Sequence, residues 1–142
     1  MSAIAWRTPG LARRAACLVY DALLITAVVF IATFPALAVL GDATSGWRRH
    51  AMQLWVLGVV GAYLAWFWSR GGQTLAMKTW RIRLEGEHGG PVALPVAVRR
   101  YLFALAGTAL VGAGFLWAFV DRDRQFLHDR LARTRLASVD PP

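Results

Sequence analysis

The stretch that most constrains the fold is the apolar run from Ala15 to Leu40, in which Asp21 is the only charged residue. A run of this length is typical of a helix that crosses a lipid bilayer. A carboxylate inside such a helix costs about 2.5–3.5 kcal/mol on insertion scales. Because folding alone does not require that cost, Asp21 is the first candidate for a functional residue. Arg14 lies two helical turns earlier, on the same side of the helix and about 10 Å away along its axis.

The composition also favours a membrane protein. Hydrophobic residues make up 57% of the 142-residue chain, which is too apolar for a typical soluble domain of this size. The length predicts one domain, residues 1–142. A net charge of +8 would suggest nucleic acid on a soluble protein, but here the basic residues flank apolar runs. That pattern predicts contact with a bilayer that contains anionic lipids, and no nucleic-acid partner.

The apolar runs predict an all-α integral membrane protein with three membrane-embedded helical segments, at about residues 11–40, 51–69 and 101–120. The first run is too long for the apolar part of a cleaved signal peptide, and it contains Asp21, so we expect a retained helix. The third run is either a plain span or a broken, re-entrant segment. A break is suggested by three glycines, at positions 107, 112 and 114.

A small basic, strand-like hairpin is expected between the second and third runs. Residues 80–84 alternate between apolar and basic side chains, which is the period of a β-strand. Residues 85–90 have the composition of a turn, and residues 91–94 would form the return strand. Residues 134–139 also have weak strand character. If the third run is re-entrant, this tail would lie beside the strand at 80–84.

Three blocks of the sequence resemble the RDD family of small membrane proteins, which is named for one arginine and two aspartates. The opening block is Arg14-Ala-Ala-Cys-Leu-Val-Tyr-Asp21, and the central block runs from Gly72 to Lys78 and on through residues 80–83. The closing block is Leu127-His-Asp-Arg-Leu-Ala-Arg-Thr-Arg-Leu136. The similarity covers residues 10 to 139, with Ala76 and Arg133 standing where the family usually has glycine.

On this resemblance the name-giving residues are Arg14, Asp21 and Asp129, and the central block adds Thr74 and Lys78 as candidates. The resemblance implies a multi-pass protein of the bacterial inner (plasma) membrane. A role in transport has been suggested for the family, and we take it as one expectation.

No enzymatic pattern is found in the sequence, so we expect no enzyme, no cofactor and no metal site. The histidines are scattered, and no known zinc-ligand spacing occurs. His128 stands beside Asp129, and it either titrates near neutral pH or forms a structural polar pair at a helix end. Asp129 itself is expected to accept from backbone donors at a helix start, or from Arg81, Arg83 or Arg99.

Two functions from different classes remain open. In the first, the protein transports a proton, an ion or a small solute, with Asp21 as the coupling group balanced by Arg14 or Arg100. In the second, it is an accessory or assembly factor of a membrane complex, with Asp21 in a structural ion pair. Because three segments form a thin wall, transport would need a homo-oligomer or a membrane protein partner.

Charge counting predicts the topology. With the N-terminus in the cytoplasm and three full spans, nine of the sixteen basic residues lie inside and seven outside. With a re-entrant third segment, fourteen lie inside and two outside. The positive-inside rule favours the re-entrant form.

Overall fold

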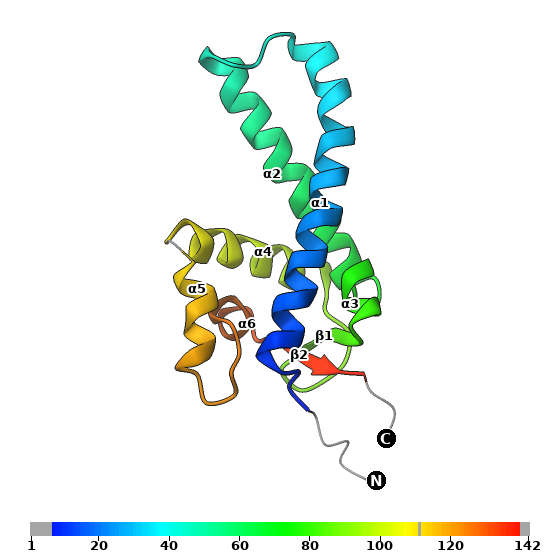
Figure 1. Ribbon diagram of the computed structural model, residues 1–142, viewed down its shortest axis with the longest axis vertical. Coiled ribbons are helices and arrows are strands. Elements are labelled where there is room, and N and C mark those ends of the chain that lie inside the picture. The colour runs from blue at the N-terminus through cyan, green and yellow to red at the C-terminus, as the bar shows by residue number, and fades with distance from the viewer. Residues whose placement is uncertain (1–6, 111, 140–142) are drawn as a thin grey trace.

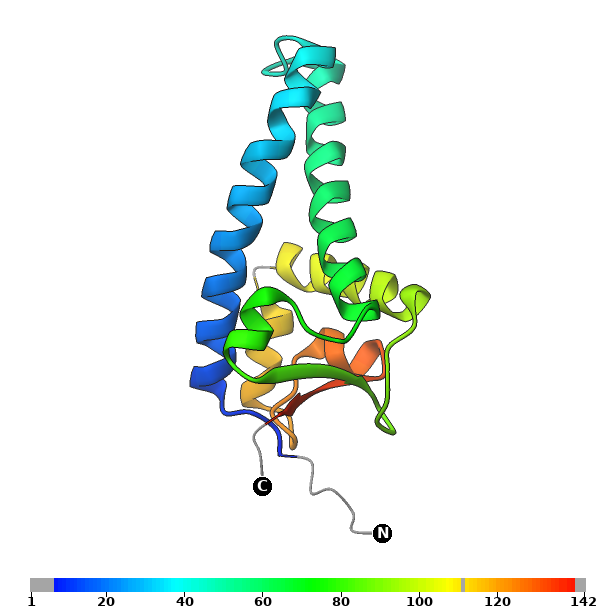
Figure 2. The same ribbon diagram turned by 90° about the vertical axis from the view of Figure 1, so that its right-hand side faces the viewer.

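The computed structural model describes residues 7–110 and 112–139. Two long helices, α1 (Leu11–Leu40) and α2 (Gly46–Ser69), form an antiparallel hairpin that stands on a smaller base (Figures 1 and 2). Both helices are long and apolar enough to cross a membrane, and little of either is buried within the chain. The first two predicted membrane segments are therefore present, although α2 begins five residues earlier than expected.

The base is built from short elements, and α4 crosses it beneath the hairpin (Figure 1). The α4 helix packs against α2 on one side and against α6 on the other. The buried core includes Trp68, Ile82, Leu84 and Ala97. In chain order the base elements are α3 (Leu75–Thr79), β1 (Ile82–Gly86), α4 (Leu94–Ala109), α5 (Ala113–Leu116), the 3-10 helix η1 (Trp117–Phe119), α6 (Leu127–Leu131) and β2 (Thr134–Ser138).

The strand at the centre of the chain pairs with the C-terminal strand and not with its neighbour in sequence. β1 and β2 are antiparallel, with Leu84 opposite Leu136. The predicted alternation is confirmed for Ile82 and Leu84, which are buried while the flanking arginines are exposed. Trp80, however, is exposed and lies before the strand. The prediction of a return strand at residues 91–94 was wrong, since these residues precede or begin α4. Pro95 lies in the first turn of α4, where proline favours a helix start.

The third apolar run is not one continuous helix. α4 ends at Ala109, and Gly112 has φ +75°, a conformation that glycine adopts most readily. After this turn the backbones of Gly107 and Gly114 come together, so that a Cβ on Gly107 would lie 3.2 Å from the Cα of Gly114. The predicted break is therefore present, and a plain span over residues 101–120 is not observed.

Both ends of the described chain lie at the base, opposite the connection between α1 and α2 (Figure 1). The Ser138 amide donates to the Arg7 carbonyl at 2.9 Å. The Arg13 guanidinium donates to the Ser138 hydroxyl at 3.0 Å. The predicted neighbourhood of the tail and the strand is confirmed, and the N-terminal segment joins them.

Candidate functional site: a cavity beside the first helix

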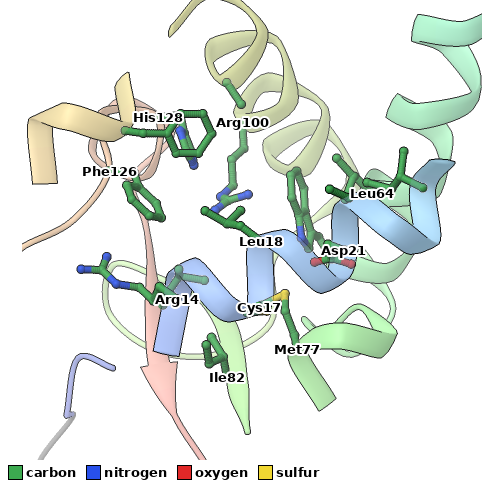
Figure 3. A pocket seen from close by; sticks show the side chains of 16 residues that line it. Arg14, Cys17, Leu18, Asp21, Leu64, Met77, Ile82, Arg100, Phe126 and His128 are labelled. Carbon is green, nitrogen blue, oxygen red and sulfur yellow. The ribbon is translucent and has the colours of Figure 1, made fainter. Parts of the chain in front are cut away.

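The residues of α1 that the chain buries are Arg14, Cys17 and Asp21. Their spacing of three and four places them on one helical face, which confirms that Arg14 and Asp21 point to the same side. This face borders a cavity of about 200 Å³ in the base (Figure 3). The cavity is therefore bounded along one side by the opening block of the sequence.

The cavity wall is mainly apolar. Leu18 lies between Arg14 and Asp21 on α1, and aromatic rings line other parts of the wall (Figure 3). Leu18 is also 41% exposed, so the cavity reaches the surface beside α1. The apolar lining side chains include Leu18, Leu64, Trp68, Met77, Phe115 and Phe126.

Asp21 has one hydrogen-bond partner in the part of the chain that the structure describes. Its Oδ2 accepts from the Thr74 hydroxyl at 2.8 Å, whereas its buried Oδ1 has no partner among the described residues. Neither Arg14 nor Arg100 pairs with it, so the expected cation partner was wrong. Arg100 is already bound to Asp129, and Arg14 reaches the carbonyl of Arg124. Asp21 is thus a buried carboxylate without an ion pair in the described part of the chain.

Thr74 is held in place by the local backbone. Its hydroxyl accepts from the Met77 amide at 3.2 Å and so caps the start of α3. Two residues earlier, Gly72 has φ +71°, and its carbonyl accepts from the Leu84 amide at 2.7 Å. A Cβ on Gly72 would lie 2.4 Å from the Leu84 carbonyl oxygen, so only glycine fits. The glycine-rich block therefore serves to present Thr74 to Asp21.

Arg14 is a buried guanidinium with unused donors. Its side chain is almost fully buried, it donates through Nη2 to the Arg124 carbonyl, and it lies over the Phe126 ring at 4.8 Å. Its Nε and Nη1 have no hydrogen-bond partner within residues 7–110 and 112–139. An unpaired cation and an unpaired carboxylate therefore border the same cavity (Figure 3).

Arg100 and Asp129 form a closed ion pair next to this cavity. Arg100 donates to Asp129 Oδ1 through Nε at 3.0 Å and Nη2 at 2.6 Å, and its guanidinium stacks on Trp68 at 4.1 Å. Asp129 Oδ2 accepts from the Phe126 amide at 3.3 Å. The expected bond to a helix start is confirmed. The arginine is Arg100, however, while the expected Arg99 donates to the Ala132 carbonyl.

His128 is buried between rings and is not a neutral-pH switch. Burial, and next the nearby positive charge of Arg100, lower its pKa to about 4, although Asp129 acts in the opposite direction. The prediction that it titrates near neutral pH was wrong, because α6 places it against Phe115 and Phe126, out of water. Its Nε2 lies 3.7 Å from Asp129 Oδ1, as in the structural-pair alternative.

The remaining candidates separate into those at the site and those away from it. Lys78 is exposed on α3 and does not line the cavity. Arg133 has φ +54°, so it keeps a turn conformation that glycine would adopt easily. Sequence reasoning did not single out Phe126 or Trp68 as residues of the site. Trp66 is exposed, but Trp68 is buried under Arg100.

The two long apolar helices, of which little is buried within the chain, are typical of a small helical membrane protein. The model of the RDD family matches residues 8–133, and the chain belongs to the RDD family. Arg14, Asp21 and Asp129 all fall within the matched region. No curated protein and no solved structure matches the chain.

Proposed function

We propose that this RDD protein takes part in transport across the bacterial inner membrane, and that Asp21 binds and releases the proton or cation that drives the movement. The observation that carries this proposal is the unpaired Oδ1 of Asp21, which is buried beside a cavity that opens at the surface. Acids inside membrane helices commonly serve as proton or ion sites. A purely structural carboxylate would instead have its charge balanced by a cation, as Asp129 does.

The proposed topology has two crossings, with both described ends and the base on the cytoplasmic side. Fourteen of the sixteen basic residues lie in the base or at the adjoining ends of α1 and α2, and two, Arg48 and Arg49, lie at the far end, at the start of α2. This asymmetry agrees with the positive-inside rule. In this arrangement the break near Gly112 returns the chain to the side from which it came. The basic base would also face anionic lipid heads.

A transport pathway has to be enclosed by more membrane helices than one chain supplies. Most of the surface of α1 and α2 is exposed within the single chain, including Phe30, Phe34 and Leu54. Two helices cannot surround a polar path, since backbone and charged groups must be shielded from lipid. We therefore propose that the working form is a homo-oligomer or a complex with a membrane protein partner.

A flux assay tests the function. Purified protein is reconstituted into liposomes that contain a pH-sensitive dye, and an imposed membrane potential drives proton entry. We expect Asp21→Asn to lower the flux at least about tenfold, because it removes the ionisable group. Asp42→Asn is the matched control, since Asp42 is exposed in the connection between α1 and α2, and its flux should equal that of the unchanged protein.

The control outcomes separate the two functions that the sequence left open. If the unchanged protein and Asp21→Asn move protons equally, Asp21 is not the coupling group. If neither exceeds empty liposomes, in the presence or absence of a carboxylate solute, the transport proposal fails. The accessory role in a membrane complex is then favoured, and the exposed apolar faces of α1 and α2 are its docking surface.

A further inference from the structure

The cavity beside α1 is lined by ionisable as well as apolar side chains. Besides the Cys17 thiol, four ionisable groups of the described chain line it: Arg14, Asp21, Arg100 and His128. The charge of Arg100 is balanced by Asp129, and His128 is neutral at ordinary pH. Asp21 is bound by Thr74, but no described residue forms an ion pair with Arg14. Among the described groups at this end of the cavity, the Arg14 guanidinium is therefore the one without a direct ion pair or a full set of acceptors.

The feature of the site that indicates a ligand is the set of Arg14 hydrogen-bond donors that have no acceptor in the described chain. Its Nε and Nη1 are buried and have no acceptor in the described chain, and a buried cation without acceptors is unfavourable. The Phe126 ring and the Arg124 carbonyl hold the guanidinium in a fixed position. A carboxylate or a similar oxyanion would accept from these donors with charge-assisted hydrogen bonds.

The rest of the wall selects for a ligand with an apolar body. Leu18 lies between Arg14 and Asp21 on α1 (Figure 3). Apolar side chains of other elements, among them Leu64, Trp68 and Phe115, also line the cavity. A small inorganic ion would leave these surfaces without contacts, whereas an alkyl or aryl group would fill them. The exposure of Leu18 gives such a ligand a way in beside α1.

We infer that the cavity between Arg14 and Asp21 binds a small amphipathic anion, with its oxyanion on Arg14 and its apolar body along Leu18 towards Trp68. As the substrate of transport this ligand rests on the proposed function, but its binding is measurable without any transport. Asp21 lies about 10 Å from Arg14 along the helix, at the far end of the apolar part. The two groups thus have separate tasks, Arg14 holding the anion and Asp21 holding the proton or cation.

Binding is tested by calorimetry on the full chain in lipid nanodiscs, with empty nanodiscs as the blank. The probe is hexanoate, and the comparison probes are hexylammonium, of the same length and opposite charge, and inorganic phosphate. We expect saturable binding of hexanoate alone. Arg14→Gln should weaken it at least about tenfold, since charge-assisted hydrogen bonds are lost. Arg49→Gln, an exposed arginine on α2, is the matched control and should bind normally.

Two further variants keep the test decisive. Ala104 lines the cavity from α4, so Ala104→Leu should block hexanoate while leaving Arg14 in place, even if Arg14→Gln fails to fold. Asp21→Asn should bind hexanoate as well as or better than the unchanged protein, because the negative charge of Asp21 is removed from the far end of the cavity. Loss of flux with retained binding in Asp21→Asn would support both proposals. Binding without flux in the unchanged protein would remove only the transport proposal.

Three outcomes would overturn the inference that the cavity binds an amphipathic anion. Hexanoate does not bind, hexylammonium or phosphate binds as well as hexanoate, or Arg14→Gln and Ala104→Leu both fold and bind hexanoate normally.

Discussion

Two arginine–aspartate sets lie side by side in the base, and they differ in how completely their bonds are made. Arg100 and Asp129 connect α4 to α6 through two direct hydrogen bonds, and Asp129 also accepts from a backbone amide. Arg14 and Asp21 are on one helix, do not touch, and each keeps at least one buried polar atom without a partner among the described residues. Asp129 therefore has its charge balanced by an arginine, whereas Asp21 has no ion pair in the described part of the chain. We call Arg100 and Asp129 the closed set, and Arg14 and Asp21 the open set.

The closed set explains how the base holds its shape. The short α6 helix has only five residues, and α4 lies across it. A helix that short is not stable alone, so it depends on tertiary contacts. The ion pair and the bond to the Phe126 amide provide them, and they also position Phe126 over Arg14. The closed set therefore supports the geometry of the open one.

The largest expected effect comes from breaking the closed set. Asp129→Ala leaves Arg100 buried without its carboxylate, and such a loss typically costs about 3–5 kcal/mol of unfolding free energy. Denaturant titration in detergent micelles measures it. Asp123→Ala is the control, because this carboxylate contacts Arg130 at the surface and its removal should cost less than about 1 kcal/mol. Equal losses for the two variants would contradict the comparison.

The next effect depends on pH and acts through His128. Its folded pKa, about 4, lies below the ordinary value of 6.5, so the unfolded chain binds the proton first as the pH falls. Stability should therefore decrease from about pH 6.5 down to about pH 4, by up to about 3 kcal/mol. The groups that face the ring are Arg100, Asp129, Phe115 and Phe126.

The contribution of the His128 ring to the pH dependence of stability is obtained by comparing the unchanged protein with His128→Gln. His128→Gln cannot take up the proton, so its unfolding free energy should change less than that of the unchanged protein between pH 6.5 and pH 4. Carboxylates that titrate in the same range contribute equally to both proteins. Parallel curves for the two would show that His128 is not the group responsible.

The smallest effect concerns the open set. Thr74→Val removes the hydrogen bond to Asp21 and the cap of α3, and we expect a loss of about 1–3 kcal/mol in unfolding free energy. Thr74→Ser keeps the hydroxyl and should cost clearly less. Thermal unfolding of the pair in micelles provides the measurement. If serine is as damaging as valine, the methyl group matters more than the bond, and Asp21 does not depend on Thr74.

The sequence predicted the parts of this structure that depend on local pattern. The long apolar run predicted α1, and the seven-residue spacing put Arg14 and Asp21 on one face. Alternation predicted the buried side of β1, and glycines predicted the break after α4. Each of these follows from residues that are close together in the chain.

The parts that were missed depend on contacts between distant residues. The sequence offers several arginines as possible partners of Asp129. The packing of α4 against α6 determines that the partner is Arg100. The pKa of His128 depends on a degree of burial that its position beside Asp129 and Arg130 in the sequence does not suggest. The same holds for β1, whose partner is the last strand of the chain and not the residues that follow it.

The pairing of β1 with β2 has a consequence for biosynthesis. β2 leaves the ribosome after all the other described elements, yet it contacts the Arg7 carbonyl, the Arg13 side chain and β1. The hairpin of α1 and α2 can insert early, but the base cannot close until β2 has been synthesised, because its contacts join residues far apart in the sequence. Until then the edge of β1 is uncovered and able to pair with other chains. Completion of the C-terminal strand is thus the step that turns an inserted helical hairpin into a folded protein.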